Sequence, residues 1–322
     1  MTTSISPTAS TGGAVLPPAP PVEAARRGFA EIIAPYAYIA PFFALFAVFG
    51  LIPLLFTFYV ALFDWNPIGE QVFIGLDNFS RLFGDVRFWN AARNTVSIWL
   101  LSTVPQLLIA LLLAHLLNHV RLRFAVFFRM TMLVPYITSV AATAIVFVQM
   151  FDRDYGLLNW LLGLVGVEPI DFTQSVMGSH VLIAVMVTWR WFGYTTLLYL
   201  ASLQAVPRTI YEAAAVDGAG GVRQFLHISL PSLRPVIVFT IVTSTIGGLQ
   251  IFTEALLVNR GAANTCGPVR QCQTLTLFLF EQGFIQFKFG YAAAVGVALF
   301  VMVVVLASLN YFLSTRIRPV KS

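Results

Sequence analysis

The stretch Glu212–Pro231, EAAAVDGAGGVRQFLHISLP, is a polar segment that separates two long apolar runs of the chain. Pro207 lies just upstream, and proline is well tolerated in the first turn of a helix. The sequence therefore predicts a helix that begins after Pro207 and ends near Gly218. The glycine pair that follows interrupts helical structure, and Val222–Ser229 predicts a second short helix. We expect this segment to project from its surroundings as a helix–turn–helix.

The rest of the chain is too apolar for a water-soluble domain. Of its 322 residues, 58% are hydrophobic and 10% are charged, so lipid must solvate much of the surface. A helix needs roughly 20 mostly apolar residues to cross the hydrocarbon core. Six stretches meet this requirement: 36–62, 96–117, 130–151, 181–203, 235–258 and 291–314. They lack the short alternating pattern of barrel strands. We therefore expect an all-α membrane protein with six transmembrane helices and one long loop at 204–234.

The distribution of Lys and Arg orients these spans. With the N-terminus inside, eleven bases fall on the cytoplasmic side: Arg26, Arg27, Arg121, Arg123, Arg129, Arg208, Arg223, Arg234, Arg316, Arg318 and Lys321. Seven fall outside: Arg81, Arg87, Arg93, Arg153, Arg260, Arg270 and Lys288. Cytoplasmic loops carry the excess of Lys and Arg, so both termini and the 204–234 loop are expected inside. The net charge of +5 follows this asymmetry, and no nucleic-acid partner is expected.

Two domains are expected from composition. Residues 1–34 are rich in Thr, Ser, Pro, Gly and Ala and have few large apolar groups, which predicts a disordered cytoplasmic tail. Residues 35–318 are expected to form the transmembrane domain.

Few groups in the chain suggest reactive chemistry. The P-loop pattern GxxxxGK[ST] is absent, and neither Lys288 nor Lys321 follows a glycine-rich run, so any ATP must be bound by a partner. The histidines are dispersed and no catalytic constellation is present, so we expect neither an enzyme nor a directly bound cofactor. Cys266 and Cys272 lie in the last outside loop, where a local disulfide is expected, with two free thiols as the alternative. A zinc site usually needs four Cys or His ligands, and these two Cys have no supporting His, so no metal site is expected.

Three of the expected spans carry polar and aromatic groups that could contact a solute. Polar groups within spans are energetically costly and mark transport pathways by default. The sequence TWRWFGY lies in span 181–203 and GGLQIFTE in span 235–258. The candidate solute-binding residues are Tyr136, Ser139, Arg190, Trp191, Tyr194, Gly247, Gln250 and Glu254. Gln250 and Glu254 are four residues apart and are expected to share a helix face. For Arg190 and Glu254, a structural ion pair is the alternative.

The polar loop follows a longer pattern: Glu-Ala-Ala, three residues, Gly, nine residues, and Ile-x-Leu-Pro. This pattern resembles the EAA loop of membrane subunits in ABC importers, which forms a coupling helix docked on a separate ATPase. The resemblance implies that ATPase coupling involves Glu212, Ala213, Ala214, Asp217, Gly218, Ile228, Leu230 and Pro231. The alternative is an ordinary connector with chance similarity.

Further stretches at 74–95, 133–159 and 270–284 are similar to sugar-importer permeases of the maltose-permease type, and the similarity extends over residues 34–316. The resemblance implies a sugar-contacting role for six of the candidates above: Tyr136, Arg190, Trp191, Tyr194, Gly247 and Gln250. Tyr136 and Tyr194 keep the residue type of maltose permease. Arg190, Trp191 and Gly247 depart from it, which argues against maltose as the cargo. The sequence FGYAAAVGVALF at the start of the last span resembles the disaccharide branch.

The resemblance also implies an assembly. It predicts a bacterial plasma (inner) membrane complex that contains a second homologous permease, two ATPase subunits that use ATP and Mg, and an extracytoplasmic sugar-binding protein or lipoprotein. This chain would form half of the path for a sugar or oligosaccharide. The alternative is a secondary transporter driven by an ion gradient, which would need no ATPase.

Overall fold

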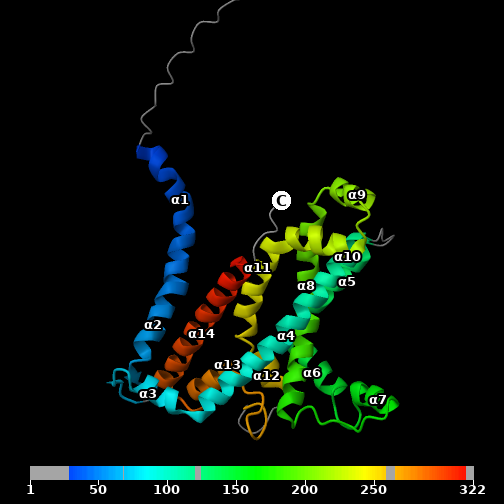
Figure 1. Cartoon of the computed structure of the whole chain (residues 1–322). Coiled ribbons are helices and arrows are strands. Elements are labelled where there is room, and N and C mark those ends of the chain that lie inside the picture. Colours follow the sequence, from blue (N-terminus) through cyan, green and yellow to red (C-terminus); the bar gives the residue numbers. More distant parts are fainter. Residues whose placement is uncertain (1–28, 68, 120–124, 259–264, 317–322) are drawn as a thin grey trace, which may run out of the picture. The chain divides into compact units, whose positions relative to one another are not determined.

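The described part of the chain is almost entirely helical. The computed structural model describes residues 29–67, 69–119, 125–258 and 265–316 (Figure 1). Five helices in this part are long and apolar enough to cross a membrane, and a sharply bent pair makes a sixth span if it is counted as one. The strands described are only β1 (Phe63–Asp64) and β2 (Val72–Phe73), which form a short antiparallel pair. The all-α membrane prediction is confirmed at this level.

The first of two compact units comprises residues 1–53. It contains α1 (Phe29–Phe46), the π-helical turn η1 (Ala47–Leu51) and the start of α2 (Ile52–Val60). The helix begins at Phe29, so the tail boundary expected after residue 34 falls inside α1. Ala and Glu in this stretch favour helix, which lets α1 begin before the apolar run. Residues 1–28, the remainder of the expected tail, lie outside the described residues.

Two long helices, α4 (Val86–His119) and α8 (Val176–Gln204), pack along each other in the second unit, which comprises residues 54–322. Hydrogen bonds join them at three levels. Ser97 Oγ lies 3.0 Å from His180 Nδ1, Thr188 Oγ1 donates to the Ser102 carbonyl at 3.0 Å, and Gln106 Nε2 donates to Thr195 Oγ1 at 3.0 Å. Because polar groups buried in lipid need partners, these pairs hold the two helices in a defined register.

Helix α4 begins ten residues before the expected span 96–117. The sequence before residue 96 is polar and favours a loop, but the structure gives these polar groups partners. The Asp85 carboxylate accepts a hydrogen bond from the Arg87 backbone N–H at 2.8 Å and so caps the helix start. Asn90 and Asn94 then donate to the Arg270 carbonyl, at 3.0 Å each. The boundary was predicted wrongly because a distant segment satisfies these side chains.

The expected span 130–151 consists of two helices, α5 (Ala125–Ile137) and α6 (Val140–Met150), bent by 92°. The break lies at Thr138 and Ser139, and Ser139 has extended backbone with ψ 130°. The Thr138 hydroxyl donates to the Val134 carbonyl at 2.6 Å and competes for the helical hydrogen bonds there. The expected span therefore corresponds to two helices with a sharp bend between them. A short helix, α7 (Leu157–Leu164), follows.

The polar loop after α8 contains α9 (Arg208–Val216) and α10 (Gly221–Gln224). The expected second short helix does not stop at Pro231. Instead α10 continues through the π-helical turn η2 (Phe225–Ser229) into α11 (Leu230–Gly248), and Pro231, which has no backbone N–H, lies just after this turn, where the regular α-helical hydrogen bonding is already interrupted. α11 ends at Gly248, so the expected span 235–258 is shifted, and a separate helix, α12 (Thr253–Val258), follows.

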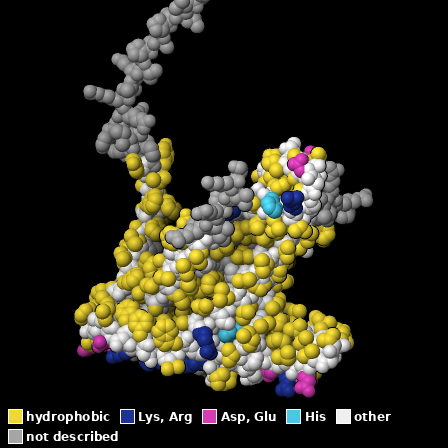
Figure 2. All heavy atoms as spheres, in the orientation of Figure 1, with side chains coloured by type: hydrophobic (Ala, Val, Ile, Leu, Met, Phe, Trp, Pro, Cys, Tyr) yellow, Lys and Arg dark blue, Asp and Glu magenta, His cyan; other side chains and the backbone are white. Residues whose placement is uncertain are grey.

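The remaining elements pack around the end of the chain. They are α3 (Asp77–Gly84), α13 (Leu275–Phe280), the π-helical turn η3 (Glu281–Ile285) and α14 (Phe289–Arg316). Buried Leu82, Phe278 and Val295 join three of these helices in one apolar cluster. In Figure 2, apolar side chains cover most of the visible face of the second unit, and charged side chains lie toward its two ends. This pattern is expected of helices that lipid surrounds.

Candidate functional site

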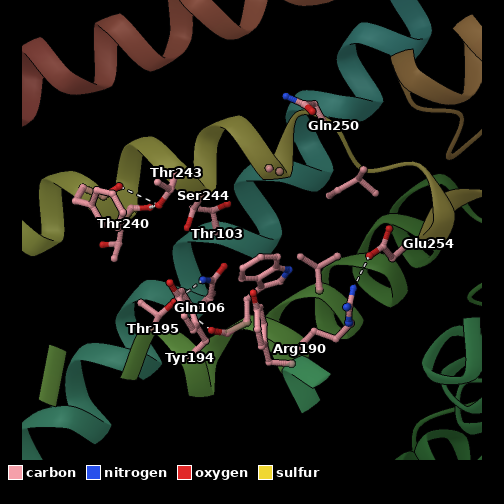
Figure 3. A pocket seen from close by; sticks show the side chains of 17 residues that line it. Thr103, Gln106, Arg190, Tyr194, Thr195, Thr240, Thr243, Ser244, Gln250 and Glu254 are labelled. Carbon is pink, nitrogen blue, oxygen red and sulfur yellow. Dashed lines mark hydrogen bonds and ion pairs between the residues drawn. The ribbon is translucent and has the colours of Figure 1, made fainter. Parts of the chain in front are cut away.

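A cavity of about 390 Å³ lies among α4, α5, α8 and α11, with part of its wall in the break between α11 and α12 (Figure 3). Ligand pockets in proteins measure about 300–1,000 Å³, so a small solute fits. Of the eight candidate solute-binding residues, seven line the cavity: Tyr136, Arg190, Trp191, Tyr194, Gly247, Gln250 and Glu254. The eighth, Ser139, does not line it and instead precedes α6 at the bend. The structure thus brings together residues from three of the expected spans.

Three aromatic rings form one wall of the cavity. The rings of Tyr136 and Tyr194 are stacked, with centroids 5.0 Å apart and an interplanar angle of 16°. Trp191 meets Tyr136 edge-on at 5.2 Å. This cluster depends on Gly193, because a Cβ at this position would lie 1.9 Å from the Met132 carbonyl oxygen. The glycine therefore lets α5 approach α8 closely enough for the rings to meet.

Hydroxyl and amide side chains line the rest of the cavity. They come from α4, α8 and α11, and several are labelled in Figure 3: Thr103, Gln106, Thr195, Thr240, Thr243 and Ser244. None of them was predicted from the sequence. Gln106 offered a usable signal, since an amide in the middle of an apolar span is energetically costly unless it has a function or a partner. The threonines gave little signal, because a Thr hydroxyl in a helix can be satisfied by the carbonyl four residues earlier.

The break between α11 and α12 places the ends of both helices at the cavity. Gln250 lies in the turn after α11 and Glu254 lies in the first turn of α12, so the expectation that they share a helix face is wrong. The backbone of the break stays satisfied. The Ile251 carbonyl accepts hydrogen bonds from Thr274 Oγ1 at 2.8 Å and from Thr276 Oγ1 at 2.5 Å. Irregular backbone at membrane depth is tolerated where it lines a cavity in this way.

Arg190 and Glu254 form an ion pair at the cavity, with 3.3 Å between Nη1 and Oε1. Their side chains are 12% and 11% exposed. Figure 3 shows Arg190 reaching from α8 toward Glu254 on α12. The ion pair that the sequence left as an alternative is therefore present, and both members also line the cavity.

The polar loop that contains α9 and α10, called the α9 segment below, differs from the cavity in its exposure. α9 buries none of its residues. It begins after Pro207, and Gly218 follows it with a φ of +77°, a conformation that strains any residue with a Cβ. The Ala219 N–H donates to the Ala214 carbonyl at 2.8 Å and closes the helix end. The structure thus has a helix between Pro207 and Gly218, the positions at which the sequence predicts its start and its end. Glu212, Ala213 and Asp217 of the expected coupling set are exposed on it, and Ala214 is half-buried.

The other coupling candidates lie at the base of this segment. Ile228 is half-buried in η2, and Leu230 and Pro231 begin α11. The Tyr211 hydroxyl lies 3.1 Å from Ser229 Oγ, which in turn lies 3.4 Å from His115 Nδ1 of α4. These contacts connect α9 to the ends of α11 and α4.

The disulfide loop, residues 265–274, lies on the other side of the molecule. In this loop Cys266 and Cys272 form a disulfide. The loop is anchored by distant side chains. His180 Nε2 lies 2.9 Å from the Gln271 carbonyl, and Asn94 Nδ2 donates to the Gln273 carbonyl at 3.2 Å.

Glu281 lies beneath this loop and is 2% exposed. It accepts hydrogen bonds from Arg270, with 2.8 Å between Nη2 and Oε1, and from Gln273 at 2.7 Å. Burial by itself raises the pKa of the Glu281 carboxyl, but the hydrogen bonds from Arg270 and Gln273 outweigh burial, and the pKa lies below its usual value. The ionised carboxylate therefore stabilises the loop.

Residues 95–319 match the family described as "Binding-protein-dependent transport system inner membrane component". The chain belongs to this family. The matched region contains the cavity, the α9 segment and the disulfide loop. The protein is therefore a multi-pass membrane subunit of a transport system and is not itself an enzyme. Membership also argues against the alternative of a secondary transporter driven by an ion gradient.

Several family members are similar over most of their length. The lactose transport system permease protein LacF of Rhizobium radiobacter is 38% identical over 280 residues, which are 86% of this chain and 92% of LacF. The arabinooligosaccharides transport system permease protein AraP of Bacillus subtilis (strain 168) is 33% identical over 287 residues, 89% of this chain and 90% of AraP.

Among solved structures, a bacterial ABC transporter involved in the import of the acidic polysaccharide alginate contains a similar chain. Its TM-score is 0.76 at 22% identity, and the match covers 89% of this chain and 97% of that chain. At this level of identity the two chains share the permease fold.

Proposed function

We propose that this family member is one permease subunit of an ATP-driven importer and forms half of the membrane path for a sugar or oligosaccharide, with a disaccharide as the expected cargo. The observation that carries the proposal is the cavity, which is lined both by aromatic rings and by hydroxyl and amide groups. A sugar ring presents C–H faces that pack on aromatic rings and hydroxyls that exchange hydrogen bonds with such groups. The similarity to lactose and arabinooligosaccharide permeases supports this cargo class.

In this proposal the α9 segment receives the energy of ATP hydrolysis from a separate ATPase. Its exposed tip carries Val216 and Val222, 89% and 75% exposed, and exposed apolar groups at a polar end of a protein mark an interaction surface. The α5–α6 pair counts as one span, which gives six spans and puts both termini and α9 inside. Two ATPase subunits bind ATP and Mg, and closure of the ATPases draws the coupling helices of two permeases together.

The remaining partners follow from the same arrangement. A second, homologous permease would complete the path, and an extracytoplasmic sugar-binding protein or lipoprotein would deliver the cargo to the side that contains the disulfide loop. A solved relative of the fold is in complex with a periplasmic protein bound to alginate pentasaccharide, which supports this order of partners.

Substitutions in the aromatic and amide groups of the cavity test the proposed path. In the reconstituted importer, Trp191→Ala and Gln250→Ala should each lower uptake of the cognate sugar by about tenfold or change sugar preference, because each removes a side chain that lines the cavity. Trp160→Ala removes an exposed Trp of α7 that does not line the cavity and serves as the control. Unchanged substrate profiles in both cavity variants would place the sugar path elsewhere.

A further inference from the structure

The charges of the cavity are balanced. Arg190 and Glu254 are the only Lys, Arg, Asp or Glu among the described residues that line it. Since the two are paired at 3.3 Å, the described wall carries one positive and one negative charge and is neutral as a whole.

The described residues nevertheless do not satisfy every donor of the pair. A guanidinium has several N–H donors in a planar fork, and Glu254 takes one of them at Nη1. Arg190 Nε is buried and has no hydrogen-bond partner among the described residues. A buried donor without an acceptor is destabilising, so a solute oxygen within hydrogen-bond distance of this group would supply the acceptor that the described residues do not.

The remaining polar groups of the wall are uncharged hydroxyls and amides. Thr103, Gln106 and Ser244 match the hydroxyls of a neutral sugar, which both donate and accept hydrogen bonds. A carboxylate or phosphate that enters the cavity would instead be desolvated without gaining an unpaired cation as its partner, because Glu254 already neutralises Arg190. It would also meet the like charge of Glu254, and like charges brought together are strongly unfavourable.

We propose that the Arg190–Glu254 pair makes the cavity selective for uncharged saccharides over saccharides that carry a carboxylate or a phosphate. Arg190 donates to an oxygen of the cargo, and Glu254 cancels the charge that would otherwise attract an acidic sugar. The inference rests on the proposed function, because it requires that the cavity lie on the sugar path.

The test is equilibrium binding to the purified complete importer, with its second permease and ATPase subunits but without the sugar-binding protein, which has a selectivity of its own. The probes are lactose, cellobiose and the counterparts of both that are oxidised to uronates at C6. The wild-type complex should bind a neutral disaccharide about tenfold tighter than its uronate. Glu254→Gln keeps the side-chain size and leaves Arg190 uncompensated, so it should shift this ratio toward the uronate by about tenfold.

Two further variants separate charge from structure. The double variant Arg190→Gln with Glu254→Gln restores a neutral wall and should restore the preference for the neutral sugar. Glu168→Gln makes the same chemical change at an exposed residue that does not line the cavity and should keep the wild-type ratio. Assembly of each complex is checked by size-exclusion chromatography.

The outcomes distinguish this inference from the function on which it rests. A wild-type complex that binds uronates as tightly as neutral sugars, or a ratio that Glu254→Gln leaves unchanged, overturns the selectivity of the pair while Trp191→Ala still weakens binding. If neither cavity variant, Trp191→Ala or Gln250→Ala, affects binding, or if the wild-type complex binds none of the probes, the cavity is not the sugar site and both proposals fail.

Discussion

The α9 segment and the disulfide loop are both polar interruptions of an apolar chain, and they are stabilised in opposite ways. α9 buries no residue, and at its base the Tyr211 hydroxyl contacts Ser229 of η2. In the disulfide loop, Cys266, Gln271 and Gln273 are buried, and side chains from α4 and α8 bind its carbonyls.

The difference shows what each loop still requires. The disulfide loop has its contacts within the chain, so it can hold its shape without a partner. The α9 segment exposes apolar groups at its tip, and in the proposed function these groups contact the ATPase. Local stability in proteins spans a wide range, and elements that move or dock come from the less stable end of it. We therefore expect perturbations of the two loops to have separable effects.

The largest effect is expected from Arg270→Ala, which leaves the Glu281 carboxylate buried without its main partner. Removal of one member of a buried pair destabilises by about 3–5 kcal/mol, and the lower end applies because Arg270 is 25% exposed. Amide hydrogen exchange at residues 271–274 should accelerate by about a hundredfold. Exchange in α9 should not change. Arg153→Ala changes an exposed residue on the same side of the molecule and is the control. If residues 271–274 exchange as slowly in the Arg270→Ala variant as in the wild type, other contacts hold the loop.

A smaller effect is expected from Gly218→Ala, which forces an alanine into the left-handed region. The strain is about 1–2 kcal/mol, enough to lower association with the ATPase and transport by about tenfold. Gly220→Ala is a matched control, since Gly220 has a φ of −67° and open space around a built Cβ. Equal transport by the two variants would argue against a role for the helix stop, and exchange in the disulfide loop should be unaffected in both.

Tyr211→Phe should loosen the base of α9 more gently. It removes one hydroxyl that lies 3.1 Å from Ser229 Oγ, and a hydrogen bond contributes about 1 kcal/mol net. Proteolysis within α9 should become about fivefold faster, with membrane insertion unchanged. Tyr155→Phe alters an exposed tyrosine and should leave the rate as it is. An unchanged rate in the Tyr211 variant would assign the anchoring of α9 to its apolar contacts.

The smallest effect near neutral pH concerns Glu281. Its folded pKa lies below the reference value of 4.5, so its contribution to loop stability is complete above that value and is lost as the pH falls through the folded pKa. Glu281 stays ionised between pH 7 and 5, so the protection of residues 271–274 from exchange should not change in this range. Protection should fall only in stronger acid, where the Glu281 carboxylate becomes protonated. The exchange data must be corrected for the intrinsic pH dependence of amide exchange. A loss of protection already between pH 7 and 6 would show that a different group controls the loop.

The sequence by itself determined the features that local chemistry controls. Long apolar runs predict membrane helices because a helix satisfies its own backbone hydrogen bonds in lipid. Gly218 predicts a helix end because glycine readily adopts the left-handed backbone conformation found there. The EAA pattern identified the α9 segment. Polar and aromatic groups within spans, together with the resemblance to sugar-importer permeases, pointed to seven residues that line the cavity.

Only the tertiary structure decided where the helices break and which groups meet. α4 begins early because Asn94 finds carbonyls of the disulfide loop, and the chain can leave helical structure at Ile251 because Thr274 and Thr276 satisfy its carbonyl. These partners lie far apart in the sequence, so no local pattern reveals them. Contacts between distant segments also place Glu254 beside Arg190 and Gln106 beside Thr195 at the cavity. A buried polar group is held in position by the partner that satisfies it.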